Sequence, residues 1–140
     1  MVKIQNKLIL IDTNLFIYYF QGHAVFGEYA KKVFELIVSN KAYAVGSIIT
    51  LTEILSFPID SKELNKIRDN ILELPNFYLQ DVNQTIALEA ARIGREYMFR
   101  TPDAIHLATG LFSKVDMFIT NNNQLIKKFN EFEVVALTSI

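Results

Sequence analysis

Three acidic side chains stand in stretches of the sequence that are otherwise largely apolar. Asp12 directly follows the apolar run 8–11, Glu53 is the only charged residue within 48–55, and Asp103 begins a mostly apolar stretch. An isolated buried charge is very costly, so each carboxylate needs a partner or contact with water. Carboxylate ligands suit Mg²⁺ or Mn²⁺ better than zinc, and such an ion activates water for attack on a phosphodiester. Metal-assisted phosphoryl hydrolysis is therefore the chemistry to expect if the fold brings the three acids together.

Each acid also has a purely structural interpretation. Asp12 would end a strand, and Glu53 would be a solvated residue on one helix face. Asp103 would be a favourable charge in the first turn of a helix, where the dipole contributes about 0.3–1 kcal/mol. We interpret His106, in the same stretch, as a hydrogen-bonded packing residue, because a lone histidine on an apolar helix more often packs than binds a ligand. The spacing of these residues leaves both interpretations open.

Short apolar runs and helical periodicity alternate along the chain, and they give the elements that must position the acids. Five apolar runs predict strands, at residues 8–11, 42–47, 77–82, 117–120 and 133–137. Seven further stretches predict helices, at residues 14–20, 28–39, 48–56, 61–74, 83–99, 101–112 and 122–129. Thr101 is the expected N-cap of the sixth helix, with Pro102 as its first residue. This order predicts an α/β fold with a mostly parallel central sheet flanked by helices, as a single domain over residues 1–140.

Polar side chains stand at the ends of two of the predicted strands. Asp12 follows the first strand, and the run Thr120-Asn121-Asn122-Asn123 begins at the end of the fourth. Ligand sites in parallel sheets form at the carboxyl ends of the strands, so these side chains could reach one crevice. Helix capping is the structural alternative, because Asn121 and Gln124 have the spacing of a capping box.

The composition limits the classes of protein to which the chain can belong. Its 140 residues are 51% hydrophobic, enough to form a core, and the absence of cysteine excludes disulfides and thiolate catalysis. The formal net charge of -1 argues against a broad basic face that coats nucleic acid. No signal peptide opens the chain, and no apolar stretch reaches the ~18 residues of a spanning helix. We therefore expect a soluble, cytoplasmic protein without membrane contact.

Four motifs together resemble the PIN-domain family, and within it the small VapC-type ribonuclease toxins. They are Ile11-Asp12-Thr13-Asn14, Ile49-Thr50-Leu51-Thr52-Glu53-Ile54-Leu55, Arg100-Thr101-Pro102-Asp103-Ala104-Ile105-His106-Leu107-Ala108-Thr109 and Phe118-Ile119-Thr120-Asn121-Asn122. Their order and spacing cover nearly the whole chain, so the four are specific when taken together.

The resemblance implies a PIN-like three-layer fold and a metal-dependent endoribonuclease, the toxin of a type II toxin–antitoxin pair. By this likeness the ligands of Mg²⁺ or Mn²⁺ would be Asp12, Glu53 and Asp103. The residues that form hydrogen bonds in or around that site would be Thr13, Asn14 and Thr120. The implied partners are an RNA substrate, a cognate antitoxin protein and a second copy of the chain in a homodimer.

One position departs from the family pattern, because Asn122 stands where the family commonly has an aspartate. An amide can accept a hydrogen bond from a metal-bound water but contributes no charge, which favours one metal over two. We hypothesise that Asn122 takes part in catalysis by orienting water or substrate. The alternative function is a degenerate, non-cleaving PIN domain that binds RNA or a partner protein, although three retained acids argue against it. A phosphohydrolase of the haloacid dehalogenase kind would need a second aspartate where the chain has Asn14.

Positive charge near these motifs is sparse. The candidates for contact with RNA are Arg92, Arg95 and Arg100 before Asp103, with Lys127 and Lys128 after Asn122. Solvated helix faces are the structural interpretation of the same residues. Contacts with phosphates would give affinity and salt dependence but would not select an RNA sequence.

Overall fold

The computed structural model describes all 140 residues and contains every strand and helix that the sequence predicts, with ends that differ by a few residues. The strands are β1 (Leu8–Ile11), β2 (Tyr43–Ser47), β3 (Phe77–Gln80), β4 (Met117–Thr120) and β5 (Glu133–Ala136). The helices are α1 (Thr13–Gln21), α2 (Phe26–Val38), α3 (Ile49–Leu55), α4 (Ser61–Leu72), α5 (Gln84–Tyr97), α6 (Thr101–Ser113), α7 (Asn123–Lys128) and the 3₁₀ helix η1 (Leu137–Ser139). The prediction of an α/β fold is confirmed.

The sheet is parallel throughout, in the order β3-β2-β1-β4-β5. Strand β1 lies at its centre, and Ile9, Leu10 and Ile11 are fully buried, as expected of a strand covered on both faces. The chain runs outward from β1 to β3 and then returns to β4 on the other side of β1. The strand order therefore reverses between β1 and β4, which is where open parallel sheets form ligand crevices.

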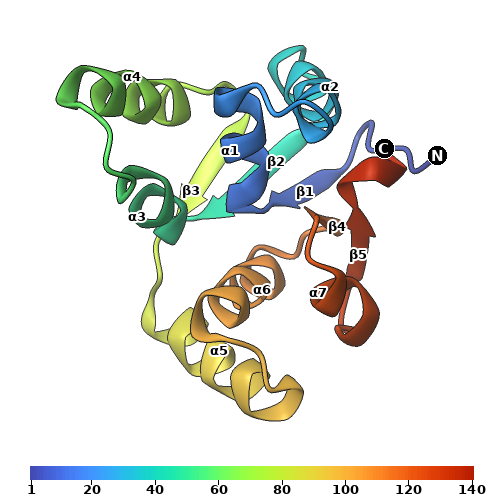
Figure 1. Ribbon diagram of the computed structural model, residues 1–140. Helices are drawn as coiled ribbons and strands as arrows, with labels where there is room; N and C mark the ends of the chain where they lie inside the picture. The colour runs from blue at the N-terminus through green and yellow to red at the C-terminus, as the bar shows by residue number, and fades with distance from the viewer.

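Two layers of helices cover the two faces of the sheet (Figure 1). One face packs against α1 to α4 through a cluster of 18 buried residues that includes Ile9, Ile11 and Ile119. The opposite face packs against α5, α6 and α7 through a cluster of 12 buried residues that includes Leu10 and Phe118. Alternate residues of the same strand thus pack against opposite helix layers, as the pleat of a β-strand requires. No helix here combines the length and the hydropathy of a membrane-spanning segment.

Helix α6 lies unusually close to the central strand. At Gly110, a Cβ atom would come within 2.8 Å of the Phe132 ring and 3.0 Å of the Leu10 side chain. A larger residue would therefore push the helix away from β1. This close packing fixes the position of the whole helix, including its first turn, against the sheet.

The start of α6 differs by one residue from the prediction. Arg100, and not Thr101, is the N-cap, with an extended backbone at ψ 153°. Thr101 and Pro102 both lie in the first helical turn, where an amide N–H needs no partner within the helix. The shift places Asp103 in the first turn, as predicted.

Candidate active site

Asp12 lies at the reversal of strand order, where β1 passes into α1. It is the N-cap residue of α1, yet its side chain makes no capping hydrogen bond. Instead its Oδ2 accepts a hydrogen bond of 2.6 Å from the Oγ1 of Thr120, at the end of β4. Asp12 is only 9% exposed and Thr120 is fully buried. A hydroxyl at the end of one strand therefore holds one oxygen of a buried carboxylate at the end of the next, while the protein donates no hydrogen bond to the other oxygen.

Glu53 on α3 reaches across to α1 and α6. Its Oε1 lies 2.8 Å from the Oγ1 of Thr13 and 2.8 Å from the Nε2 of His106. The Glu53 side chain is 35% exposed, so it is partnered on one side and reaches solvent on the other. Glu53 is therefore at the rim of the site, and it is also held by two residues far away in the sequence.

Asp103 has only a weak cationic partner. Its side chain is 19% exposed, and the Nε of Arg100 lies 3.5 Å from Oδ2. The Arg100 side chain is 81% exposed, so solvent screens most of this attraction. Asp103 thus keeps a largely uncompensated charge at the start of a buried helix.

The pKa of Asp12 depends on the other two acids. Burial raises the pKa of Asp12, and the charges of Asp103 and Glu53 raise it further. The nearby His106 and the hydrogen bond from Thr120 act in the opposite direction without cancelling the rise. Carboxylates that repel one another in this way lie close together in space. The fold thus brings together acids that stand 41 and 50 residues apart in the sequence, 12 to 53 and 53 to 103.

Glu53 and His106 shift one another's proton affinity in opposite directions. Burial favours the neutral form of Glu53, but the hydrogen bonds from His106 and Thr13 outweigh it and lower the pKa of this carboxyl. Burial also disfavours a charged His106, but the hydrogen bond to Glu53 and the charges of Asp12 and Glu53 raise the pKa of the imidazole. The pair therefore favours a carboxylate beside an imidazole that donates to it.

The polar run after β4 divides into three separate contacts. The backbone N–H of Asn122 donates to the Oγ1 of Thr120 at 3.1 Å, which links it to Asp12. The Asn122 Oδ1 accepts from the N–H of Gln124 at 3.0 Å and caps α7. Asn121 does not cap this helix; its Nδ2 donates to the Oη of Tyr18 at 3.1 Å. The predicted cap is therefore displaced by one residue, and Asn122 joins the site through Thr120.

The other predicted residues of the site also lie at the same edge of the sheet. Thr13 is buried at the start of α1, where its Oγ1 lies 3.1 Å from the Oγ1 of Thr50. Asn14 lies partly buried in the same turn, and its side chain makes no hydrogen bond within the protein. Its amide is therefore available to a ligand.

Sequence reasoning assigned no part in the site to His106 or Thr50. His106 does form hydrogen bonds, but its partner is Glu53, which makes it part of the acidic cluster. The available signal was its spacing, since a residue three positions after Asp103 lies on the same face of the helix. No comparable signal identifies Thr50, because its contact with Thr13 depends on how α3 packs against α1.

A comparison with protein families gives one match. The model of the PIN domain matches residues 9–131, which is most of the chain. The chain belongs to the PIN-domain family. A search of curated proteins gives no match.

Chains of several solved structures are similar to this chain over nearly its whole length. A chain of a toxin–antitoxin complex from Klebsiella pneumoniae has 28% identity and a TM-score of 0.67, covering 92% of this chain and 97% of that one. A chain of VapBC2 from Rickettsia felis, bound to a promoter DNA fragment, has 14% identity and a TM-score of 0.73, covering 92% and 98%. A chain of FitAcB from Neisseria gonorrhoeae has 18% identity and a TM-score of 0.67, covering 94% and 99%. The last two are similar in fold alone.

The donor chemistry of this PIN domain fits a hard divalent ion. No three His, Asp or Glu side chains are already grouped as a metal-binding set. Asp12 and Glu53 nevertheless each have one oxygen held by protein donors and a second oxygen without one. Asp103 accepts no hydrogen bond from the protein and meets only the exposed Arg100. Three carboxylates with free oxygens and too little positive charge are the donors that Mg²⁺ or Mn²⁺ prefers.

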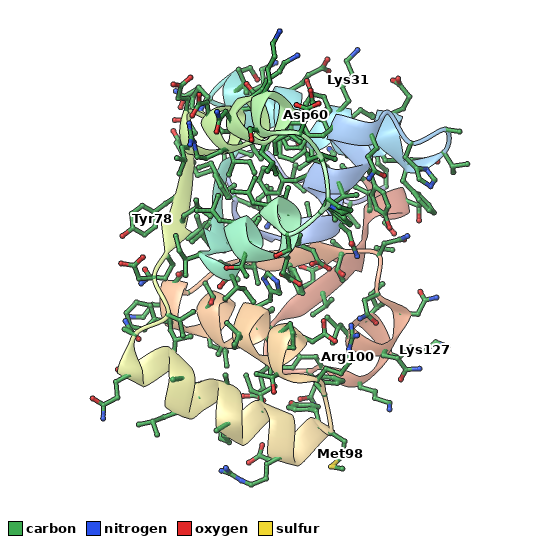
Figure 2. The ribbon with its side chains drawn as sticks, turned by 60° about the vertical axis from the view of Figure 1, so that its left-hand side comes forward. Lys31, Asp60, Tyr78, Met98, Arg100 and Lys127 are labelled. Carbon is green, nitrogen blue, oxygen red and sulfur yellow. The ribbon has the colours of Figure 1, made fainter.

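The basic residues considered for RNA contact differ in their surroundings. Arg92 forms ion pairs with Glu89, Glu96 and Glu131, so it is occupied within the protein. Arg100 is exposed beside Asp103. Figure 2 shows Arg100 and Lys127 on the same side of the molecule, on the layer formed by α5, α6 and α7. Arg92 is therefore removed from the candidates for phosphate contact, whereas Arg100 remains one.

Proposed function

We propose that the chain is a metal-dependent endoribonuclease that hydrolyses RNA phosphodiesters, and that it is the toxin of a type II toxin–antitoxin pair. The observation that carries the proposal is the cluster of Asp12, Glu53 and Asp103 at the point where the strand order reverses. The cluster has more negative charge than its surroundings compensate. Membership of the PIN-domain family, whose known members include nucleases, supports the same reaction class.

Asp12 and Asp103 are the principal ligands of Mg²⁺ or Mn²⁺ in this proposal, and Glu53 completes the set. When bound, the ion polarises a phosphoryl oxygen and lowers the pKa of the attacking water. Thr120 orients Asp12 through its 2.6 Å hydrogen bond, and Thr13 orients Glu53 through its 2.8 Å hydrogen bond. These donors hold the carboxylates in place before any ion or substrate arrives, which reduces the entropy lost on binding.

Asn122 and Asn14 contribute amides to the crevice. Because the Asn122 Oδ1 already caps α7, its Nδ2 group is the part that can orient a water or a substrate oxygen. The unpartnered amide of Asn14 supplies a second hydrogen-bonding group beside Asp12. We expect Asn122→Asp to add a charge and so raise Mn²⁺ affinity or stoichiometry in titrations. Unchanged values of both would contradict this role.

RNA would be held through its phosphates. Arg100, Lys127 and Lys128 are exposed. Arg100 is the N-cap residue of α6, three positions before Asp103, and the two lysines end α7, which begins after Asn122. Contacts of this kind are salt-dependent and do not select a base sequence. Binding of RNA to the protein should therefore weaken steeply with ionic strength.

Cleavage of a labelled RNA by the purified protein tests the proposal. We expect cleavage that requires Mg²⁺ or Mn²⁺ and is abolished by Asp12→Asn and by Asp103→Asn. Asp69→Asn, an exposed acid of α4, is the matched control and should cleave like the wild type. Cleavage retained in both site variants would rule the proposal out. An RNA complex that forms without cleavage would favour the alternative of a non-cleaving binding module.

An antitoxin and a second copy of the chain are the proposed protein partners. The Klebsiella pneumoniae relative was solved in a toxin–antitoxin complex, which supports an antitoxin for this chain as well. Co-purification with the product of a small neighbouring reading frame, and loss of RNA cleavage in that complex, would establish the pair. Light scattering of the free protein should give the mass of a homodimer, twice 16.1 kDa.

A further inference from the structure

His106 is buried beside the acidic cluster, and its ring is directed at Glu53. It lies on α6, three residues after Asp103, and is only 2% exposed. Its Nε2 lies 2.8 Å from the Oε1 of Glu53, a residue 53 positions earlier in the chain. The contact therefore connects α6 to α3.

The directions of the hydrogen bonds around Glu53 follow from the donors available. A carboxylate only accepts, so the His106 Nε2 must carry the proton that it shares with Oε1. A threonine hydroxyl has one proton, and Thr13 uses it for the same Oε1 at 2.8 Å. Thr50 then donates to the Oγ1 of Thr13 at 3.1 Å. Two donors thus converge on one oxygen of Glu53, and the other oxygen has no protein donor.

The nitrogen on the opposite side of the imidazole indicates that the contact with Glu53 is the reason for a histidine at position 106. The Nδ1 atom is buried and has no hydrogen-bond partner, the only buried side-chain polar atom of the protein in that state. Leaving a buried polar atom unpaired is costly, and an apolar residue would fill the space without that cost. A histidine that served packing alone would therefore be unfavourable here.

We infer that His106 is a positioning residue that, with Thr13, fixes one oxygen of Glu53 so that the other faces the proposed metal site. This inference rests on the proposed function. Glu53 lies on a seven-residue helix at the rim, and a free glutamate there would sample several rotamers in solvent. The two donors limit it to one orientation. Partners of this kind typically change metal affinity by about 10–100-fold when they are removed.

Titration of Mn²⁺ into metal-free protein, followed by calorimetry and by electron paramagnetic resonance, tests the inference without using cleavage. We expect His106→Leu to bind Mn²⁺ about 10–100-fold more weakly than the wild type. His106→Gln, whose amide nitrogen reaches about as far as Nε2, should restore most of the affinity. Thr109→Val is the matched control, because Thr109 is buried on the same helix and donates only to the Ile105 carbonyl.

The possible results separate the inference from the function on which it rests. Wild-type affinity in a folded His106→Leu variant overturns the role of His106 and leaves the nuclease proposal intact. Absence of Mn²⁺ binding by the wild type overturns both. If His106→Leu does not fold, Thr13→Val removes the other donor to Oε1 and should weaken binding to a similar extent; unchanged binding overturns the inference.

Nitrogen NMR of the imidazole adds a readout that a packing role would not give. We expect a proton on Nε2 in the wild type at every pH at which the protein is folded, and a shifted Nε2–H resonance in Glu53→Ala. A proton on Nδ1 with a bare Nε2 would overturn the inference, because Nε2 could then not donate to Glu53.

Discussion

Two groups of three carboxylates in this protein have opposite surroundings. The surface cluster consists of Glu89, Glu96 and Glu131 around Arg92, which contacts all three. The crevice cluster consists of Asp12, Glu53 and Asp103, which have only His106 and the exposed Arg100 nearby. Both groups thus contain the same number of acids. They differ in burial and in the positive charge that the chain provides.

The difference appears in the proton affinities of the two clusters. At the surface, the hydrogen bond from Arg92 is the largest influence and lowers the pKa of Glu131. In the crevice, burial is the largest influence and raises the pKa of Asp12. The chain pairs its surface acids with arginine but provides little positive charge for its buried acids. The crevice cluster therefore lowers the stability of the folded protein. Such a shortage, more than the number of acids, is what indicates a functional site.

The largest effect should come from Asp12→Asn, which removes a charge at the centre of the crevice cluster. The amide can still accept the hydrogen bond from Thr120, so the fold should persist. We expect Mn²⁺ affinity to fall by more than about 100-fold, the upper end of the effect of losing an outer partner. The metal-free protein should melt at a higher temperature than the wild type, because a buried and repelled charge is gone.

Glu131→Gln is the matched change in the surface cluster. It should leave Mn²⁺ binding unchanged and lower the melting temperature, the reverse of the Asp12 variant. If both variants moved stability in the same direction, the contrast between the clusters would be wrong. Calorimetric titration and differential scanning calorimetry measure the two quantities.

An intermediate effect is expected for Thr120→Val, which removes the donor to Asp12 without changing any charge. The Thr120 hydroxyl also accepts from the backbone N–H of Asn122, so the variant should loosen both residues. Mn²⁺ affinity should fall by about 10–100-fold. Thr120→Ser, which keeps the hydroxyl, should stay close to the wild type in the same titration. An equal loss of affinity in Thr120→Ser would contradict this role, because serine keeps the hydroxyl that donates to Asp12.

The sequence predicts the fold well because local patterns determine it. The buried strand at residues 8–11 has an unbroken apolar run, and Asn83 caps α5 through a 2.8 Å bond to the N–H of Ile86. The edge that holds the site also follows from a general rule, since polar residues after β1 and β4 mark the carboxyl ends of parallel strands. Asp12 and Thr120 accordingly lie together at the edge where the sequence predicts them, whereas the roles of the three acids in catalysis stay predictions.

The partners of these acids are beyond the reach of sequence patterns. The contact of Glu53 with His106 joins two helices across 53 residues. Helical spacing places His106 on the same face as Asp103 but does not identify Glu53 as its partner. The displacement of the cap from Asn121 to Asn122 depends on Tyr18, which engages Asn121 from α1. Arg92 is a further example, because pairing with Glu131 across 39 residues withdraws it from RNA contact. In each case tertiary packing selects among hydrogen-bonding partners that the sequence leaves equally available.

A smaller effect is expected from Arg92→Ala, which breaks the surface cluster. Three partly exposed ion pairs at roughly 0.2–1 kcal/mol each predict a loss of about 1–2 kcal/mol in the free energy of unfolding. Denaturant unfolding measures this loss, which should shrink in high salt. Mn²⁺ affinity and RNA binding should not change. A marked loss of RNA affinity would return Arg92 to the candidates for phosphate contact.

The smallest effect should be the pH dependence of the metal-free protein. The pKa of His106 is raised above its ordinary value of 6.5, so its stabilising contribution is complete below pH 6.5 and is lost as the pH rises through the folded value. Asp12, also with a raised pKa, acts in the same direction because its ionisation in the buried site is unfavourable. The pKa of Glu53 is lowered below 4.5, so its contribution is present above pH 4.5 and is lost on further acidification.

The directions of these pKa shifts predict that the pair of Glu53 and His106 contributes most to stability between about pH 4.5 and 6.5. Melting temperatures in the presence of a chelator should decline as the pH rises above that range. His106→Gln should flatten the decline, whereas Arg92→Ala should preserve it, because Arg92 makes no contact with Glu53 or His106. A decline that persists unchanged in His106→Gln would assign it to Asp12 alone. Added Mn²⁺ should oppose the decline in the wild type, since an ion that binds the ionised carboxylates stabilises the folded state most where they are deprotonated.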